Sequence, residues 1–234
     1  MPSVVVFDLE TDLLFSQCAC TSRAQKLQIM EATVACALVI DADLCLDLER
    51  AHIALERGES LHFWRDDAGL AFEPLLRLFD TAECIVAYNG LDFDMPVLRK
   101  YYGSGRRSQD RYMSHRNKFH DPFVRVRSHA DYWPKLNDLL LANGLHSKTA
   151  SGVEAVTMWA EGRRDELLRY CSEDVRLLAQ LCLKPCVIVP RAGEVPNHIF
   201  GITSAIASLR ASTGMSAACE ETETTELARK TPRR

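Results

Sequence analysis

Apolar residues in the first part of the chain fall in short, nearly unbroken runs, which is the pattern of strands buried within a sheet. Two such runs, at residues 3–9 and 31–41, predict strands, the second of them well buried. CIVAY at 84–88 predicts a short central strand. The shorter runs at 43–48 and 61–64 predict two more strands.

The spacing of apolar residues is helical in the segments between and after these runs. In 69–83 the apolar positions 72, 75, 76 and 79 share one helical face, and 93–102 starts a helix with its proline near the first turn. Three helical patterns follow, at 135–143, 153–162 and 164–183. Strands come early and helices late, so the sequence predicts an α/β fold with a mixed β-sheet flanked by α-helices.

Length and composition indicate one domain with short additions. The 234 residues are 47% hydrophobic, which supplies one core of ordinary size. We place the domain at 1–190 and a C-terminal extension, with a short helix as one option, at 191–210. Residues 211–234 lack apolar periodicity and are rich in Ser, Thr and Glu, so we predict a disordered tail.

Charge, cysteine content and hydropathy indicate a protein of the cell interior. The net charge of −4 gives no overall cationic field, so any nucleic-acid surface must be local. The nine cysteines include no C-x-x-C pair, which favours reduced core thiols over zinc ligands or disulfides. The chain starts without a signal-like segment, and its longest apolar run, 32–40, is too short to span a bilayer. We expect a soluble protein in a reducing compartment, cytoplasm or nucleus, without membrane association.

Two carboxylates interrupt the first predicted strand. Asp8 and Glu10 stand two residues apart, so on a strand their side chains point to the same side. Two neighbouring anions repel each other and resist desolvation, and a hard divalent cation compensates them well. The alternative is an ordinary edge strand whose acids are solvated.

Further acids follow at two later positions. Asp94 comes after the turn signal Asn89-Gly90 and follows a predicted strand, at the end where open α/β sheets build their sites. Tyr170 and Asp174 are four residues apart and share one helix face. Each has a plain alternative: Asp94 as an acid near a helix N-terminus, and the Tyr170–Asp174 pair as a coincidence.

In chain order the three motifs D-x-E, N-x-x-x-F-D and Y-x-x-x-D resemble those of the DEDDy-type 3′-to-5′ exonucleases of the RNase H-like superfamily. Residues 3–183 carry this resemblance, and the later segments also look like a stand-alone form of the exonuclease domain of family B DNA polymerases. The resemblance implies an RNase H-like fold, two Mg²⁺ or Mn²⁺ ions, and release of nucleoside 5′-monophosphates from the 3′ end of single-stranded DNA or RNA. It implies the metal ligands Asp8, Glu10, Asp94 and Asp174, a catalytic Tyr170 that orients the attacking water, and Thr11 and Asn89 near the terminal nucleotide.

A locally basic segment spans residues 99–127, with nine lysines and arginines against two aspartates and five interleaved aromatic residues. Such a segment can bind single-stranded nucleic acid, because cations track the phosphates and rings stack on bases. We therefore predict substrate contacts from Arg106, Arg107 and Arg111. A solvated insertion kept soluble by its arginines is an equal alternative.

Several other side chains have less specific expectations. His115, His120 and His129 are expected in a polar loop, because their spacings do not fit a helical pair of metal ligands. Lys148 is either a phosphate contact or an ordinary exposed lysine. Trp133 and Trp159 are expected in the core, and protein partners are left open.

Two classes of function compete. A catalytically silent RNase H-like module that binds nucleic acid or a protein is the alternative to the exonuclease. The intact set of clustered acids favours the enzyme, since a silent module has no reason to keep such costly charges. An endonuclease or small-nucleotide phosphodiesterase on the same site is a narrower third option.

Overall fold

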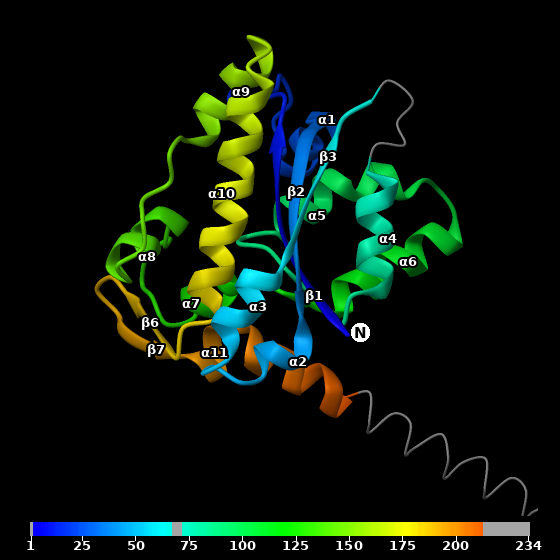
Figure 1. Ribbon diagram of the computed structural model, residues 1–234. Coiled ribbons are helices and arrows are strands. Elements are labelled where there is room, and N and C mark those ends of the chain that lie inside the picture. Colours follow the sequence, from blue (N-terminus) through cyan, green and yellow to red (C-terminus); the bar gives the residue numbers. More distant parts are fainter. Residues whose placement is uncertain (1, 67–71, 213–234) are drawn as a thin grey trace, which may run out of the picture.

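A five-stranded mixed sheet forms the centre of the computed structural model, which describes residues 2–66 and 72–212 (Figure 1). Its strands are β1 (Ser3–Thr11), β2 (Ala32–Asp41), β3 (Glu59–Trp64), β4 (Cys84–Val86) and β5 (Phe119–His120). They lie in the order β3-β2-β1-β4-β5. β1 is antiparallel to β2 and parallel to β4, so the sheet combines both kinds of pairing. The predicted α/β class, a mixed sheet flanked by helices, is confirmed.

Both faces of β1 are covered, as its apolar run predicts. Val4, Val5, Val6 and Phe7 have no solvent exposure. Val4 and Val6 belong to one buried cluster, whereas Val5 and Phe7 belong to a second cluster on the opposite face. This alternation follows from the two-residue period of a strand.

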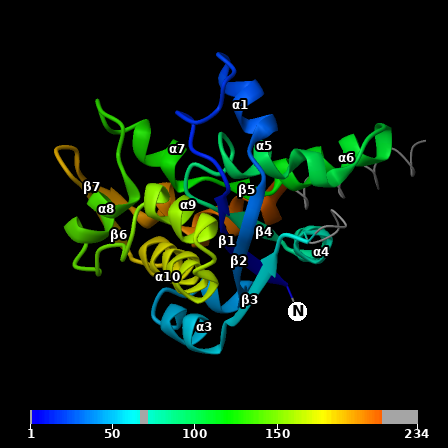
Figure 2. The ribbon, with the colours of Figure 1, turned by 90° about the horizontal axis from the view of Figure 1, so that it is seen from above.

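One long helix covers the first of these faces. Helix α10 (Arg164–Cys182) packs on β1 and β2, and its apolar residues join the cluster of Val4 and Val6. Helix α4 (Glu73–Thr81) covers the opposite face, where Phe79 lies 4.8 Å from Phe7 between ring centroids. Seen from above, α10 and α4 lie on opposite sides of the strands (Figure 2). The remaining helices are α1 (Arg23–Ile29), α2 (Ala42–Cys45), α3 (Ala51–Arg57), α5 (Asp94–Leu98), the 3-10 helix η1 (Arg99–Tyr102), α6 (Arg106–Asn117), α7 (Pro122–Arg127), α8 (Leu136–Ala142), α9 (Gly152–Ala160) and α11 (Asn197–Phe200).

The strand predicted at 43–48 is wrong, because the chain turns into α2 there. Asp41 ends β2 and caps the helix: its Oδ1 accepts the backbone N–H of Asp43 at 2.8 Å and that of Leu44 at 3.3 Å. A side-chain cap of this kind supplies acceptors that favour a helix start over a continued strand. The other predicted strands lie within or overlap β1, β2, β3 and β4.

The basic segment 99–127 belongs to the fold and is not a solvated insertion. It contains η1, α6, β5 and α7, and the rings of Tyr102, Tyr112 and Phe123 are buried. Buried rings do not stack on bases, so the predicted stacking is wrong for these three residues. The expectation of a polar loop is also wrong for two histidines: Asp80 contacts Nε2 of His115 at 2.8 Å inside the packed region, and His120 is buried in β5.

Trp133 and Trp159 are not buried inside the core as expected, although Trp159 packs against its edge. Trp133 is 53% exposed, although its ring packs on Phe123 at 4.7 Å between centroids. Trp159 is partly exposed, with the Arg164 guanidinium 3.4 Å from its ring centroid. An amphipathic ring that carries a cation on its face can remain at the surface.

The C-terminal part packs on the same core. Strands β6 (Cys186–Val189) and β7 (Gly193–Pro196) form a hairpin, and residues 202–212 are helical. Val187 and Ile206 join the cluster that α10 covers, and the predicted domain boundary at 190 falls within the hairpin. The disordered tail was predicted at 211–234, and its residues from 213 onward lie outside the described part of the chain. No helix in the described ranges is both long and apolar enough to cross a membrane.

Candidate active site

The end of β1 brings two acids to the face that α10 covers. Because Phe7 and Leu9 face the second cluster, the alternation of the strand turns Asp8 and Glu10 toward α10. One carboxylate oxygen of each acid and the sulfur of Cys171 lie within 4.8 Å of one another. The Cys171 thiol also donates to the Asp8 carbonyl oxygen at 3.5 Å, which ties the helix to the strand.

Asp94 reaches the same place from the turn that follows β4. Asn89 adopts φ 62°, a left-handed conformation that asparagine tolerates. A Cβ on Gly90 would lie 2.6 Å from the ring of Phe119, so only glycine fits the next position. The turn leads into α5, where Asp94 is 3% exposed and accepts a backbone hydrogen bond from Leu9.

A buried aspartate that the sequence did not single out fixes this turn. Asp121 accepts the backbone N–H of Asn89 at 2.9 Å and that of Leu91 at 3.1 Å. It also accepts the N–H of Phe123 at 3.0 Å and caps α7. Asp121 therefore positions the Asn89–Asp94 loop. The only signal in the sequence is an acid directly before a proline, which is typical of a helix cap.

Helix α10 supplies Tyr170 and Asp174, and a loop lysine joins them. The Tyr170 phenol and the Asp174 carboxylate are neighbours on one face of the helix, as the i, i+4 spacing allows. Lys148 Nζ lies 2.5 Å from Asp174 Oδ2 and 5.1 Å from the Tyr170 ring centroid. The backbone N–H of Lys148 donates to Asn137 Oδ1 at 2.9 Å, which holds the loop. Lys148 is therefore not an ordinary exposed lysine, and its expected contact with a phosphate stays a prediction.

The acids raise one another's pKa values. Burial, followed by the charge of Asp174, raises the pKa of Asp8 to about 7, while Lys148 opposes this rise. Burial and the neighbouring Asp8 raise the pKa values of Glu10 and Asp94 well above the ordinary range. Burial also raises the pKa of Asp174, against the lowering effect of Lys148. Several buried carboxylates this close together are costly to ionise, and a bound positive charge would offset that cost.

The donor set suits a hard divalent cation. Within the described residues Asp94 Oδ1 and Asp174 Oδ1 are buried and have no hydrogen-bond partner. Buried carboxylate oxygens are rarely left without a partner unless an ion or water fills the gap. Cys171 is a poor candidate for the ligand set, because burial raises the pKa of its thiol and a neutral sulfur is a soft donor.

A cavity of about 280 Å³ opens over these groups. Asp8, Glu10, Asp94 and Tyr170 line it, together with Lys148. The two other residues predicted near the terminal nucleotide, Thr11 and Asn89, also line this cavity, and so do the rings of Phe15 and Phe93.

The predicted arginine contacts lie apart from this cavity, on α6. Arg106 and Arg107 are exposed, and their role as substrate contacts stays a prediction. Arg111 is engaged within the fold: it contacts Glu73 at 3.0 Å and Asp80 at 2.7 Å. The geometry therefore gives Arg111 a structural role, joining α6 to α4.

Comparison with known proteins identifies similar folds. No protein-family model and no curated sequence matches the chain. The family B DNA polymerase of the hyperthermophilic archaeon Pyrobaculum calidifontis aligns with a TM-score of 0.50 at 16% identity, over 88% of this chain and 27% of the polymerase. E. coli exonuclease I in complex with a dT13 oligonucleotide aligns with a TM-score of 0.41 at 18% identity, over 72% of this chain and 42% of exonuclease I. The chain thus spans about a quarter of the polymerase, and the likeness to that polymerase supports the fold class.

Proposed function

We propose that the protein is a DEDDy-type 3′-to-5′ exonuclease that uses two divalent cations, Mg²⁺ or Mn²⁺. It removes nucleoside 5′-monophosphates from the 3′ end of single-stranded DNA or RNA. One observation carries the proposal: Asp8, Glu10 and Asp94 line one cavity, and Asp174 lies close enough to raise the pKa of Asp8. Buried oxygens of Asp94 and Asp174 have no hydrogen-bond partner among the described residues. Residues that only stabilise a fold rarely combine these features.

Asp8, Glu10, Asp94 and Asp174 would hold the cations. Bound divalent ions lower the pKa of water and neutralise charge that develops on a transferred phosphoryl group. The acids themselves are kept close by β1, the turn before α5 and α10, so their geometry does not depend on a mobile segment. In the hydrolysis, the oxygen of water forms a bond to phosphorus and the bond to the 3′ oxygen breaks. The shortened strand keeps a 3′ hydroxyl, and the phosphate leaves on the terminal nucleotide.

Tyr170 positions the water and does not act as a base. Burial, with Glu10 and Asp174 nearby, raises the pKa of Tyr170 above its ordinary value. The phenol therefore stays protonated at neutral pH and can donate one hydrogen bond. Burial of the ring on α10 holds the side chain in place.

Lys148 places a positive charge beside the acids. Burial lowers its pKa, but the charges of Asp8 and Asp174 outweigh burial and raise it, so the side chain stays an ammonium ion. Its side chain is 24% exposed at the cavity, within reach of a phosphate. We propose that Lys148 exchanges its contact with Asp174 for a phosphate oxygen of the substrate when a cation takes its place.

The cavity favours a single terminal nucleotide. Its volume of about 280 Å³ is at the small end of ligand sites. Thr11 and Asn89 offer hydrogen-bonding groups, and the Phe15 and Phe93 rings, 5.9 Å apart between centroids, offer apolar surface for a base or sugar. A paired end would have to separate before it could enter.

Cleavage products on a denaturing gel test the proposal and its alternatives. The substrates are 5′-labelled DNA and RNA strands of the same sequence, incubated with Mn²⁺. We expect a ladder that shortens by one nucleotide at a time and that is blocked by a 3′-terminal cap. Discrete internal fragments would indicate an endonuclease, and binding without cleavage would indicate the silent module.

The same structure supports the predicted compartment. All eight cysteines within the described residues are free thiols, and most are buried. Free buried thiols suit a reducing environment. We therefore propose an intracellular protein. From the proposed activity, its partner is single-stranded nucleic acid.

A further inference from the structure

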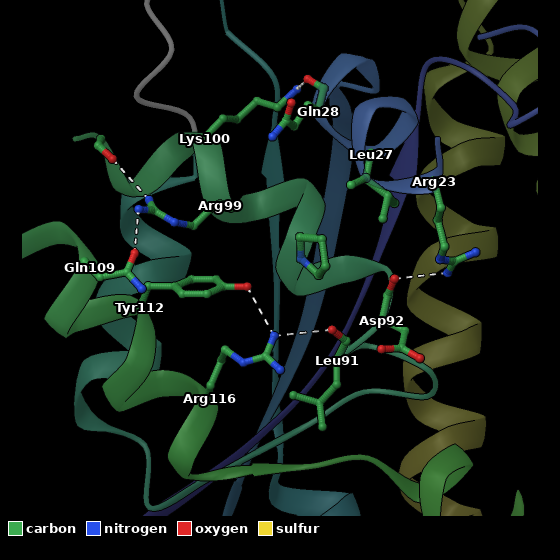
Figure 3. Close-up of a pocket in the computed structure, with 13 residues that line it drawn as sticks. Arg23, Leu27, Gln28, Leu91, Asp92, Arg99, Lys100, Gln109, Tyr112 and Arg116 are labelled. Atoms are coloured by element: carbon green, nitrogen blue, oxygen red, sulfur yellow. Dashed lines mark hydrogen bonds between the residues drawn. The ribbon is translucent and has the colours of Figure 1, made fainter. Parts of the chain in front are cut away.

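A second and larger cavity lies beside the acidic one, between α1, α5, η1 and α6 (Figure 3). Its volume is about 830 Å³. Three arginines, Arg23, Arg99 and Arg116, line it from different elements, and the apolar side chains of Leu27 and Pro96 form part of its surface. We call this cavity the arginine groove.

Neutral acceptors hold two of the guanidinium groups in place. Arg99 donates to the Gly103 carbonyl at 3.1 Å and to Gln109 Oε1 at 2.8 Å. Arg116 donates to the Tyr112 hydroxyl at 3.3 Å. The two guanidinium carbons lie 5.2 and 5.8 Å from the centroid of the Tyr112 ring. Both cations are therefore oriented without being neutralised.

The third guanidinium stands at the opposite end of the groove. Arg23 donates to the backbone carbonyl of Asp92 at 3.0 Å, and Figure 3 shows this contact across from Arg99 and Arg116. Within the described residues none of the three arginines forms an ion pair with a carboxylate. Lys100, in the same lining, differs because it pairs with Glu31 at 3.0 Å.

The arginine groove begins where the acidic cavity ends. The Arg23 guanidinium lies 4.9 Å from the ring centroid of Phe15, and Phe15 lines the acidic cavity. Asp92 lines the arginine groove, and the next two residues, Phe93 and Asp94, line the acidic cavity. A strand that leaves the acidic cavity past Phe15 would meet Arg23 first, with Arg99 and Arg116 further along the groove.

We propose that the arginine groove binds the sugar-phosphate backbone of the substrate strand upstream of its 3′ end. This inference rests on the proposed function. An oriented guanidinium without a carboxylate partner is well suited to phosphate, to which it can donate two hydrogen bonds. Leu27 and Pro96 provide apolar contact for the sugars between the phosphates. Contacts to phosphate carry no sequence information, so we expect binding through these arginines to be independent of sequence.

A triple variant, Arg23→Gln with Arg99→Gln and Arg116→Gln, tests the groove. The matched control is Arg50→Gln with Arg57→Gln and Arg77→Gln, which removes the same charge from exposed positions on and beside α3 and α4. Binding of a fluorescent dT20 strand is measured by anisotropy in EDTA, over a range of salt concentrations. Thermal unfolding of each variant checks that the fold is intact.

We expect the groove variant to bind dT20 roughly 10- to 100-fold more weakly, as loss of several charged hydrogen bonds implies. The slope of log affinity against log salt should become shallower by about 2, or about 0.7 for each lost phosphate contact. The control should keep the wild-type affinity and slope. If the triple variant unfolds, the single Arg23→Gln variant replaces it, because Arg23 is exposed and its loss should cost one contact.

The outcomes separate this inference from the proposed function, since binding in EDTA needs no catalysis. Equal affinity and salt slope in the groove variant and the control would overturn the groove, whether or not the protein cleaves DNA. If wild type cleaves no substrate but the groove variant still binds dT20 more weakly than wild type does, the role of the groove is supported and the proposed function is refuted. Displacement of dT20 by poly-glutamate as effectively as by unlabelled dT20 would also overturn the proposal, in favour of an acidic peptide.

Discussion

Replacement of Asp8 by asparagine removes one crowded acid while keeping the size of its side chain. In the folded protein burial and Asp174 raise the pKa of Asp8 to about 7, against 3.8 for an unperturbed aspartate. Well below pH 3.8 the group is protonated in both states and does not change stability. As pH rises from 4 to 7, the unfolded chain loses the proton first, so the free energy of unfolding falls.

Above pH 7 Asp8 is ionised in both the folded and the unfolded state, and the decrease in the free energy of unfolding has reached its full size. The two pKa values differ by about 3, which corresponds to about 4 kcal/mol at 1.36 kcal/mol for each pH unit. An uncharged amide at this position carries no such penalty, so Asp8→Asn should be more stable than wild type at pH 8, by up to this amount. At pH 4 the two proteins should be about equally stable.

Urea unfolding followed by circular dichroism in EDTA measures this difference, at pH 4 and at pH 8. Asp110→Asn is the control, because Asp110 is exposed and distant from the acidic cavity, so its substitution should change neither value appreciably. With excess Mg²⁺ the advantage of Asp8→Asn should shrink, since the cation stabilises only the protein that binds it. If Asp8→Asn is less stable than wild type at pH 8 in EDTA, Asp8 is a structural acid and the reasoning is refuted.

Three further substitutions separate the roles of individual residues. Asp174→Ala should leave almost no activity, whereas Tyr170→Phe should lower the single-turnover rate roughly 10- to 1,000-fold by deleting one hydrogen bond; a rate equal to wild type would make Tyr170 a packing residue. Lys148→Met should bind Mn²⁺ more tightly in calorimetry, because the cation no longer displaces an ammonium ion from Asp174; weaker binding would contradict the proposed exchange. Arg111→Gln should lower the free energy of unfolding by about 1–2 kcal/mol, since its partly buried contacts with Glu73 and Asp80 are lost. It should leave affinity for dT20 unchanged, and a shallower salt slope would restore Arg111 as a phosphate contact.

Local patterns in the sequence predicted the elements that carry the candidate site. The apolar run with Asp8 and Glu10 is β1, and the i, i+4 spacing of Tyr170 and Asp174 lies on α10. These predictions succeed because strand and helix periods alone decide which side chains share a face. The roles of these residues stay proposals that activity measurements must test.

Contacts between distant segments could not be predicted in this way. Lys148 meets Asp174 only because the loop before α9 folds back over α10. The charge of residues 99–127 suggested an exposed segment, but the acids that neutralise Arg111 come from α4, 31 and 38 residues away in sequence. Likewise, two guanidinium groups of the arginine groove belong to the basic segment, whereas the third comes from α1. Charge along a chain does not show which side chains face one another after folding.

Release of a labelled 3′-terminal nucleotide tests the central claim most directly. The substrate is a single strand labelled on its last nucleotide, and the products are separated by thin-layer chromatography. With Mn²⁺ we predict that wild type releases labelled nucleoside 5′-monophosphate, and that neither EDTA-treated protein nor Asp94→Asn does so. Undiminished release in excess chelator, or by Asp94→Asn, would contradict a metal-dependent exonuclease built on these four acids.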